Sequence, residues 1–299
     1  MTLIFIPPMA PSVSVRVAPS SFACRGARAL RASAARAAAP RAVRSQAVMS
    51  SESWARVSVE KPTLYDMPIS NNGAKVRLVI YKKGLEGEVD IVSPADLGGL
   101  KSPEYLAANP LGKMPTLALP DGSAFPESQV ILEYLMDKYA SLGPSLLPAT
   151  PEGRAQAALV ARMLDIYIGG VQGCMYRGPM DATVRAAQIK EIAVQLDNLE
   201  TVVQGPYVAG DEMCFGDLSI FPTFVFMTYM LPTYFGWGSV FTGRPKLAAW
   251  WELMLQDGDV QRVHGELTTA LDEWAAGGRW DKTGINDTVA NEKGLQWAY

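Results

Sequence analysis

The sequence predicts a protein with two folded parts, an α/β domain containing a mixed sheet and then an all-helical domain. Three observations support this prediction. At 299 residues the chain is long enough for two hydrophobic cores. Strand patterns alternate with helical patterns through residues 60–142 in the order βαβ–ββα, which favours a mixed sheet covered by helices. After a proline-rich linker at 143–150 the strand signals stop, and residues 151–276 carry only helical patterns.

The α/β part is predicted from short apolar runs separated by turn residues. Val76, Val79 and Ile80 form one apolar stripe of a helix, and Asp121-Gly122 is a hairpin turn signal. Strands are expected at Thr63–Met67, Glu88–Val92, Thr116–Leu119 and Ala124–Phe125, and helices at Gly73–Gly84, Pro103–Ala108 and Glu127–Tyr139.

The second part is predicted from helical periodicity interrupted by Gly, Pro or Asp. Helices are expected at Glu152–Tyr176, Thr183–Val203, Asp217–Leu231, Lys246–Gln256 and Val260–Trp274. Residues 277–299 are expected to form a polar tail that is ordered only by docking.

One almost uncharged stretch, Leu218–Gly238, raises the alternative of a membrane span. A spanning helix needs about twenty continuous apolar residues, whereas this stretch contains Pro222 and Pro232 and several hydroxyl side chains. A helix buried on all sides at the centre of the helical domain is therefore predicted, with no membrane as partner.

The amino-terminal residues 1–50 are rich in Arg, Ala, Ser and Val and contain no Asp or Glu. That composition is typical of an organelle transit peptide. Residues 43–47 resemble plastid cleavage sites, which favours the chloroplast stroma over the alternatives of mitochondrion or cytoplasm. A disordered basic tail is the other interpretation of the segment.

Charge and residue counts exclude several classes of site. After residue 51 the chain has 20 basic against 30 acidic residues, so its net charge of about −10 argues against nucleic acid as a partner. Cys24, Cys174 and Cys214 are odd in number and have no zinc-ligand spacing, and His264 is the only histidine. The sequence therefore predicts no metal site and no disulfide framework.

Four motifs stand at element boundaries of the predicted fold. They are residues 67–77 (MPISNNGAKVR), 112–116 (GKMPT), 126–128 (PES) and 210–219 (GDEMCFGDLS). With the predicted order of elements, they resemble the glutathione transferase family over about residues 61–275, and the first resembles the serine-type catalytic loop of the tau class. The resemblance implies a thioredoxin-like, glutathione-binding domain at 60–142, a homodimer, and glutathione as co-substrate with no other cofactor.

Ser70 falls on the catalytic serine of that family. A thiol with a pKa of about 8.5 is only slightly ionised at neutral pH, and the thiolate is the nucleophile. A hydroxyl donor and the positive end of a helix both favour the anion, and lowering its pKa by about two units takes ~2.7 kcal/mol. A serine at a helix start is also an ordinary N-cap, and spacing alone does not separate these two interpretations.

The resemblance assigns the other parts of glutathione to neighbouring residues. The amides of Asn71 and Asn72, which replace Pro-Phe of the tau pattern, are further donors to the sulfur. Met114 would pair its main chain with the cysteinyl part before a cis Pro115, and Lys113 would reach the glycyl carboxylate. Ser128 would hold the γ-glutamyl carboxylate at a helix N-terminus, where unpaired N–H groups bind anions, and Glu127 would pair with the ammonium group.

The last motif is structural, with Asp217 as part of a capping box in which Cys214 takes the usual hydroxyl position. The electrophile site is expected between the domains, with Tyr167, Met175, Tyr176 and Arg177 as candidates. The resemblance implies conjugation of glutathione to a small electrophile or reduction of a peroxide. The alternatives are a thiol transferase or dehydroascorbate reductase, which would need a cysteine in place of Ser70, and a non-catalytic binding or scaffold protein.

Overall fold

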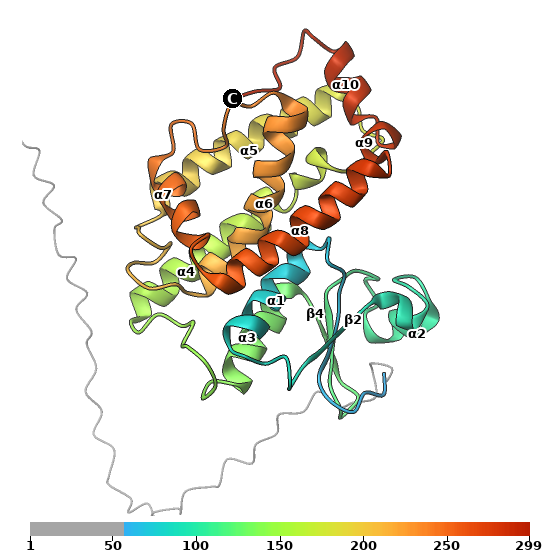
Figure 1. Cartoon of the computed structure of the whole chain (residues 1–299), viewed down its shortest axis with the longest axis vertical. Coiled ribbons are helices and arrows are strands. Elements are labelled where there is room, and N and C mark those ends of the chain that lie inside the picture. The colour runs from blue at the N-terminus through green and yellow to red at the C-terminus, as the bar shows by residue number, and fades with distance from the viewer. Residues whose placement is uncertain (1–56) are drawn as a thin grey trace, which may run out of the picture. The chain divides into compact units, whose positions relative to one another are not determined.

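The computed structural model describes residues 57–299 (Figure 1), so the predicted transit peptide lies outside the described residues. The predicted fold class is confirmed. A thioredoxin-like α/β domain with a four-stranded mixed sheet precedes a region made of helices.

The sheet consists of β1 (Thr63–Tyr65), β2 (Asp90–Val92), β3 (Thr116–Ala118) and β4 (Ala124–Pro126) in the order β2-β1-β3-β4. β1 pairs in parallel with β2 and antiparallel with β3, so that Leu64 lies opposite Ile91 on one side and Leu117 on the other. β3 pairs antiparallel with β4 across the predicted turn. The mixed sheet follows directly from the βαβ–ββα order.

Helices cover both faces of this sheet. α1 (Asn71–Lys82) and α3 (Ser128–Lys138) cover the face toward the helical region, and α2 (Pro103–Ala108) covers the opposite face (Figure 1). On the α2 face Tyr65 and Tyr105 meet edge to face with ring centroids 6.2 Å apart. The predicted stripe of α1 is fully buried, which fixes the helix against the sheet.

The second region begins with α4 (Pro151–Met163), and its helices succeed one another along the chain. These are a π-helical turn at Leu164–Ile168, a 3-10 turn at Gln172–Met175, α5 (Ala182–Val202), α6 (Phe215–Phe235), α7 (Pro245–Met254), α8 (Gly258–Ala276), α9 (Arg279–Lys282) and α10 (Ile285–Asn291). The single helix expected from Glu152 to Tyr176 is wrong in its second half. Glycines at 169, 170 and 173 disfavour a regular helix, and the chain unwinds there.

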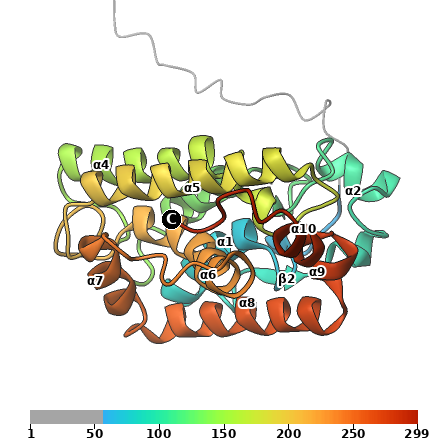
Figure 2. The ribbon, with the colours of Figure 1, turned by 90° about the horizontal axis from the view of Figure 1, so that it is seen from above.

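The uncharged stretch forms α6, which lies between α4 and α5 on one side and α8 on the other (Figure 2). By length and composition it is the one helix of residues 57–299 that could cross a membrane, and 72% of its most apolar window is buried. Its burial against α1, α4 and α8 agrees with the predicted core helix.

Residues 277–299 dock on the helical region. Trp280, Ile285 and Trp297 are buried, and the Trp237 indole donates to the Trp297 carbonyl at 2.7 Å. The backbone of Gly178 also contacts Thr283 so closely that a side chain could not be accommodated there. The segment is thus part of the helical core, which isolated tryptophans in a polar sequence did not reveal.

The capping motif at the start of α6 connects three parts of the helical region. The fully buried Asp217 carboxylate accepts from the amides of Val208 and Cys214 at 2.9 and 2.8 Å, and from the Trp250 indole at 2.8 Å. The Cys214 thiol donates to the same group at 3.2 Å. One side chain therefore holds the preceding loop, α6 and α7 together.

Asp217→Ala is expected to lower the free energy of unfolding by about 3 kcal/mol or more, because it leaves three buried N–H donors and the weaker Cys214 thiol unpaired, and each lost N–H bond costs roughly 1–3 kcal/mol. Urea unfolding followed by tryptophan fluorescence would measure the change. Asp211→Ala is the control, because it removes an exposed carboxylate from the loop just before α6. It should lower the free energy of unfolding by less than about 0.5 kcal/mol. Equal losses in the two variants would contradict the structural role.

Candidate functional site

Two adjoining cavities lie between the α/β domain and the helices. The first has a volume of about 580 Å³ and the second of about 490 Å³. They share Asn72, Lys113, Met114, Gly169 and Gln172, so they form one continuous cleft.

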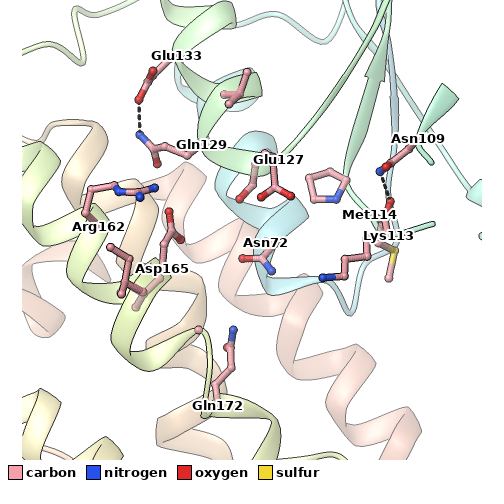
Figure 3. Close-up of a pocket in the computed structure, with 16 residues that line it drawn as sticks. Asn72, Asn109, Lys113, Met114, Glu127, Gln129, Glu133, Arg162, Asp165 and Gln172 are labelled. Carbon is pink, nitrogen blue, oxygen red and sulfur yellow. Dashed lines mark hydrogen bonds between the residues drawn. The ribbon is translucent and has the colours of Figure 1, made fainter. Parts of the chain in front are cut away.

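The structure brings together all the residues that the sequence singled out for glutathione. The first cavity is lined by Asn72, Lys113, Met114, Pro115, Glu127 and Ser128 (Figure 3). Ser70 and Asn71 line the second cavity, beside the shared wall. The predicted sulfur-binding group thus lies on the second cavity, close in sequence to Asn72, which lines both cavities.

Ser70 is the N-cap of α1 and is buried. Its Oγ accepts a hydrogen bond from the Gly73 amide at 3.0 Å. Accepting that bond uses a lone pair and leaves the hydroxyl hydrogen, for which a sulfur in the cavity would compete with the Asp66 carboxylate. The cap role and the predicted catalytic role are compatible in this geometry.

The two neighbouring asparagines lie in different environments. The Asn71 amide donates to Gln172 Oε1 at 2.6 Å and to Thr223 Oγ1 at 3.1 Å, so both of its hydrogens join α1 to the helical region. Its oxygen accepts from the Asn72 amide at 2.9 Å. Asn72 is the side chain that faces both cavities, which makes it the better placed of the two amides (Figure 3).

The loop before β3 is fixed by hydrogen bonds to its main chain from α2 and the residue that follows it. The Lys113 carbonyl accepts from the Tyr105 hydroxyl at 2.7 Å and from the Asn109 amide at 2.8 Å. The Met114–Pro115 bond is cis, as the resemblance implied. The Lys113 side chain is exposed and its amine points toward Asn72 in the cleft (Figure 3).

The start of α3 is open toward the first cavity. Glu127 has a φ of 72°, and it is the one non-glycine residue of positive φ among residues 57–299. No side chain caps the helix there, so its first N–H groups are available to an anion at the position of Ser128. Strained conformations of this kind concentrate at ligand sites.

Some of the residues that line the cleft were not found from the sequence. Arg162, Asp165 and Gln172 reach the first cavity from the end of α4 and the turns after it (Figure 3). Asp165 is held by the fully buried Lys75 of α1 at 2.7 Å. In the sequence, the only local indication of this side of the cleft was the cluster of glycines at 169–173.

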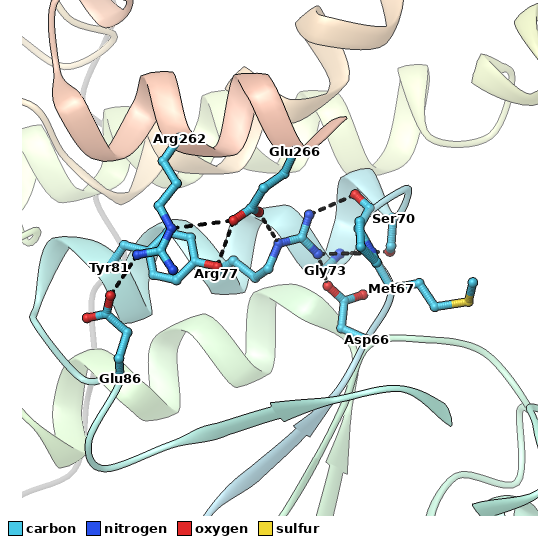
Figure 4. Close-up of polar contacts among 10 residues, drawn as sticks. Asp66, Met67, Ser70, Gly73, Arg77, Tyr81, Glu86, Arg262 and Glu266 are labelled. Carbon is cyan, nitrogen blue, oxygen red and sulfur yellow. Dashed lines mark hydrogen bonds and ion pairs between the residues drawn. The ribbon is translucent and has the colours of Figure 1, made fainter. Parts of the chain in front are cut away.

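A buried ion-pair network lies beneath the Ser70 loop (Figure 4). Arg77 of α1 pairs with Asp66 and donates to the carbonyls of Met67 and Pro68 at 3.0 and 2.9 Å. Glu266 of α8 holds the same guanidinium at 2.9 Å from the other side. The helical region therefore helps to position the loop that carries Ser70.

Asp66 occupies space that only a glycine leaves open. Its carboxylate lies against Gly73, where an added Cβ would collide with it. Burial raises the pKa of Asp66 to about 6, against the lowering effects of the Arg77 charge, the Met67 amide and the Ser70 hydroxyl. The folded state thus holds this proton longer than the unfolded chain does.

The raised pKa has a consequence for stability. The contribution of Asp66 is fully present below its unfolded pKa and is lost as the pH rises from about 4 through about 6. We therefore subtract the unfolding free energy of Asp66→Asn from that of the unchanged protein, and this difference should fall by roughly 2–2.5 kcal/mol between pH 4 and pH 7. Urea unfolding of both proteins across this range measures the difference. A difference that rises with pH would show that the Arg77 charge outweighs burial.

The described cysteines do not supply a reactive thiol. Cys174 is fully buried, and burial raises its pKa to about 12. Burial also raises the pKa of Cys214, whose thiol lies beside the Asp217 carboxylate. Neither residue lines the cleft, which leaves Ser70 where a thiol transferase would need a cysteine.

The fold and the cleft define a class of protein: a thioredoxin-like domain fused to helices, with a serine at the start of α1 and an open helix N-terminus in the cavity. Residues 64–145 match the family model for the N-terminal domain of glutathione S-transferase. Glutathione S-transferase 3 of Zea mays is 34% identical over 206 residues, which cover 63% of this chain and 86% of that one. This chain belongs to the glutathione transferase family and is an enzyme of it.

Solved structures agree in fold. Glutathione transferase F2 of Populus trichocarpa has a TM-score of 0.60 at 23% identity, covering 70% of this chain and 99% of that one. A glutathione transferase homologue from Sulfitobacter, solved with bound glutathione, has a TM-score of 0.58 at 22% identity. The match covers 70% of this chain and 99% of that one.

Proposed function

We propose that this enzyme activates glutathione as a thiolate through a hydrogen bond from Ser70 and conjugates it to a small electrophile. The observation that carries the proposal is the position of Ser70, at the N-terminus of α1 and on the second cavity, two residues before Asn72, which lines both cavities. Both the hydroxyl and the helix end stabilise a sulfur anion there. The thiolate attacks the electrophile, and the thiol proton passes to solvent.

The first cavity suits the remainder of glutathione. The open start of α3 at Ser128 offers N–H groups to the γ-glutamyl carboxylate, and the exposed Glu127 carboxylate is placed to pair with the ammonium. Met114 offers its main chain to the cysteinyl part, and Lys113 offers a positive charge to the glycyl end. These assignments leave the second cavity for the other substrate.

The direct test compares three reactions of the full chain. Conjugation of glutathione to 1-chloro-2,4-dinitrobenzene, reduction of an organic hydroperoxide and reduction of a mixed disulfide are measured with one protein preparation. The proposal expects the first to exceed the third by a wide margin. A protein that is the better thiol transferase contradicts the serine assignment. One that binds immobilised glutathione but catalyses none of the reactions supports the non-catalytic alternative.

We further propose a homodimer. Val130 on α3, Leu159 on α4, and Ile166 and Tyr167 in the turn after it are each 47–52% exposed although apolar. Val130 and Ile166 also border the first cavity, so a partner covering them would close it. Analytical ultracentrifugation of the full chain would show a dimer, and a monomer at micromolar concentration would contradict the proposal.

For location we propose the chloroplast stroma, with residues 1–50 as the transit peptide, on the strength of their composition alone. A fusion of these residues to a fluorescent protein, expressed in plant or algal cells, should enter plastids. Fluorescence in mitochondria or in the cytosol would support one of the two alternatives.

A further inference from the structure

The second cavity, which the proposed function leaves for the electrophile, carries positive charge alone. Among residues 57–299 the charged side chains that line it are Lys113 and Arg177, and no Asp or Glu of that range lines it. The first cavity, in contrast, is bordered by Glu127, Glu133 and Asp165. The body of the protein is strongly acidic, with 20 basic against 30 acidic residues after position 51. The positive cavity is therefore a local feature.

Arg177 has a fixed backbone and an available side chain. Its amide donates to the Gly173 carbonyl at 2.8 Å, and its carbonyl accepts from the fully buried Arg185 at 3.1 Å. Its guanidinium is exposed and lies 5.6 Å from the ring centroid of Tyr176. Within residues 57–299 no carboxylate forms an ion pair with it, and the side-chain hydrogen bond that it makes is with neighbouring Tyr176.

A second arginine strengthens the positive field at this end of the cavity. The Arg279 guanidinium stacks on Trp274, 3.8 Å from the ring centroid, and Trp274 lines the cavity. Its Nε is buried with no hydrogen-bond partner in the described part of the chain. Burial and the nearby charge of Arg177 both lower the pKa of Arg279. Arg279 itself lies outside the cavity lining, so its charge adds to the positive field around Arg177, and an anion bound at Arg177 would reduce the repulsion between the two cations.

Part of the wall beside Arg177 is aromatic. Tyr176 and Phe226 meet edge to face with ring centroids 5.2 Å apart, and both line the cavity with Trp274. Such a wall favours a flat, conjugated molecule. Ser70 lies on the same cavity, so a ligand held there can present a carbon atom to the sulfur.

We infer that the second substrate is an anionic electrophile, an aromatic or conjugated carboxylate whose negative group pairs with Arg177. This inference rests on the proposed function and names the substrate class of the same site. The planar guanidinium can pair with both carboxylate oxygens, which fixes orientation as well as affinity. Tyr176, Phe226 and Trp274 then hold the ring. With an aryl chloride, the new S–C bond forms as the C–Cl bond breaks and chloride leaves with the electron pair.

The test uses 4-chloro-3,5-dinitrobenzoate and its methyl ester, which differ in the charged group. For each we take kcat/KM of the full chain and divide it by the uncatalysed rate constant with glutathione. The acid should be preferred by about tenfold, the range expected of a charge-assisted hydrogen-bonded pair. Arg177→Gln should remove this preference and leave the ester within about twofold, while Arg177→Lys should retain part of it.

Arg154→Gln is the matched control. It removes the same charge from an exposed arginine that lines neither cavity and donates to the Pro148 and Ala149 carbonyls. Its preference for the acid should equal that of the unchanged protein. Equal use of acid and ester, or an Arg177→Gln protein that keeps the preference, would overturn the inference while leaving conjugation intact.

If the protein conjugates neither compound, the proposed function fails and the inference is decided by binding. The unreactive 3,5-dinitrobenzoate and its methyl ester are then titrated against tryptophan fluorescence, to which Trp274 contributes. Tighter binding of the acid that disappears in Arg177→Gln supports an anion site. Equal binding of acid and ester overturns it.

Discussion

Ser70→Ala is expected to lower turnover at neutral pH by about tenfold or more while changing the affinity for glutathione little. Without the hydroxyl donor the bound thiol pKa returns toward about 8.5, and each pKa unit corresponds to about 1.4 kcal/mol. Since the rate falls because more of the bound glutathione sulfur is protonated at neutral pH, raising the pH should restore much of the lost rate. The measurements are kcat, KM and the pH–rate profile with an aryl halide, and Ser70→Thr, which keeps a hydroxyl, should recover part of the activity.

The cap role of Ser70 needs its own control, because the side chain also accepts from Gly73. Ser102 caps α2 in the same way, accepting from the Tyr105 amide at 3.0 Å, and lines neither cavity. Ser102→Ala should cost a similar ~1 kcal/mol of stability and leave the pH–rate profile unchanged. If Ser70→Ala resembles Ser102→Ala in both respects, Ser70 is a helix cap only, and Asn72 becomes the candidate donor.

Arg77→Met is expected to have the largest effect on stability, about 3–5 kcal/mol, because it leaves the Asp66 carboxylate buried without its partner. It also removes the donors to the Met67 and Pro68 carbonyls, so the Ser70 loop loses its support and kcat should fall. Urea unfolding and steady-state kinetics test the two effects. Asp66→Asn added to Arg77→Met should recover part of the stability, since the unpaired charge is then absent.

The control for this variant is Arg262→Met on α8. Arg262 also touches Glu266, at 3.5 Å, and pairs with Glu86 at 2.7 Å, but its side chain is 48% exposed. An exposed pair contributes about 0–1 kcal/mol. A loss in Arg77→Met no greater than the loss in Arg262→Met would contradict the role assigned to the buried pair.

Features that depend on a few consecutive residues were predictable from the sequence. The βαβ–ββα order followed from strand and helix periodicity, and the helices after residue 151 followed from apolar spacing. Ser70, Pro115 and Ser128 were singled out because their short motifs resemble those of the glutathione transferase family, and the structure places the two serines at helix starts and Pro115 directly before β3. For the two serines the local geometry is enough to supply the chemical group. Ser70 offers a cap hydroxyl, and Ser128 lies at a helix end whose N–H groups are open.

Features that join distant segments were decided by tertiary structure alone. The hydrogen bond between Arg77 and Glu266 spans 189 residues, and no periodicity in either helix indicates the partner. Part of the wall of the second cavity arises because the chain unwinds after α4, and α6 and α8 add Phe226 and Trp274 to it. Arg279, which follows α8, brings a second positive charge near Arg177. A sequence pattern records which side chains are apolar or charged. Only the packing of α1, α6 and α8 decides which charges are left without a partner, and so which substrate charge the cavity can pair.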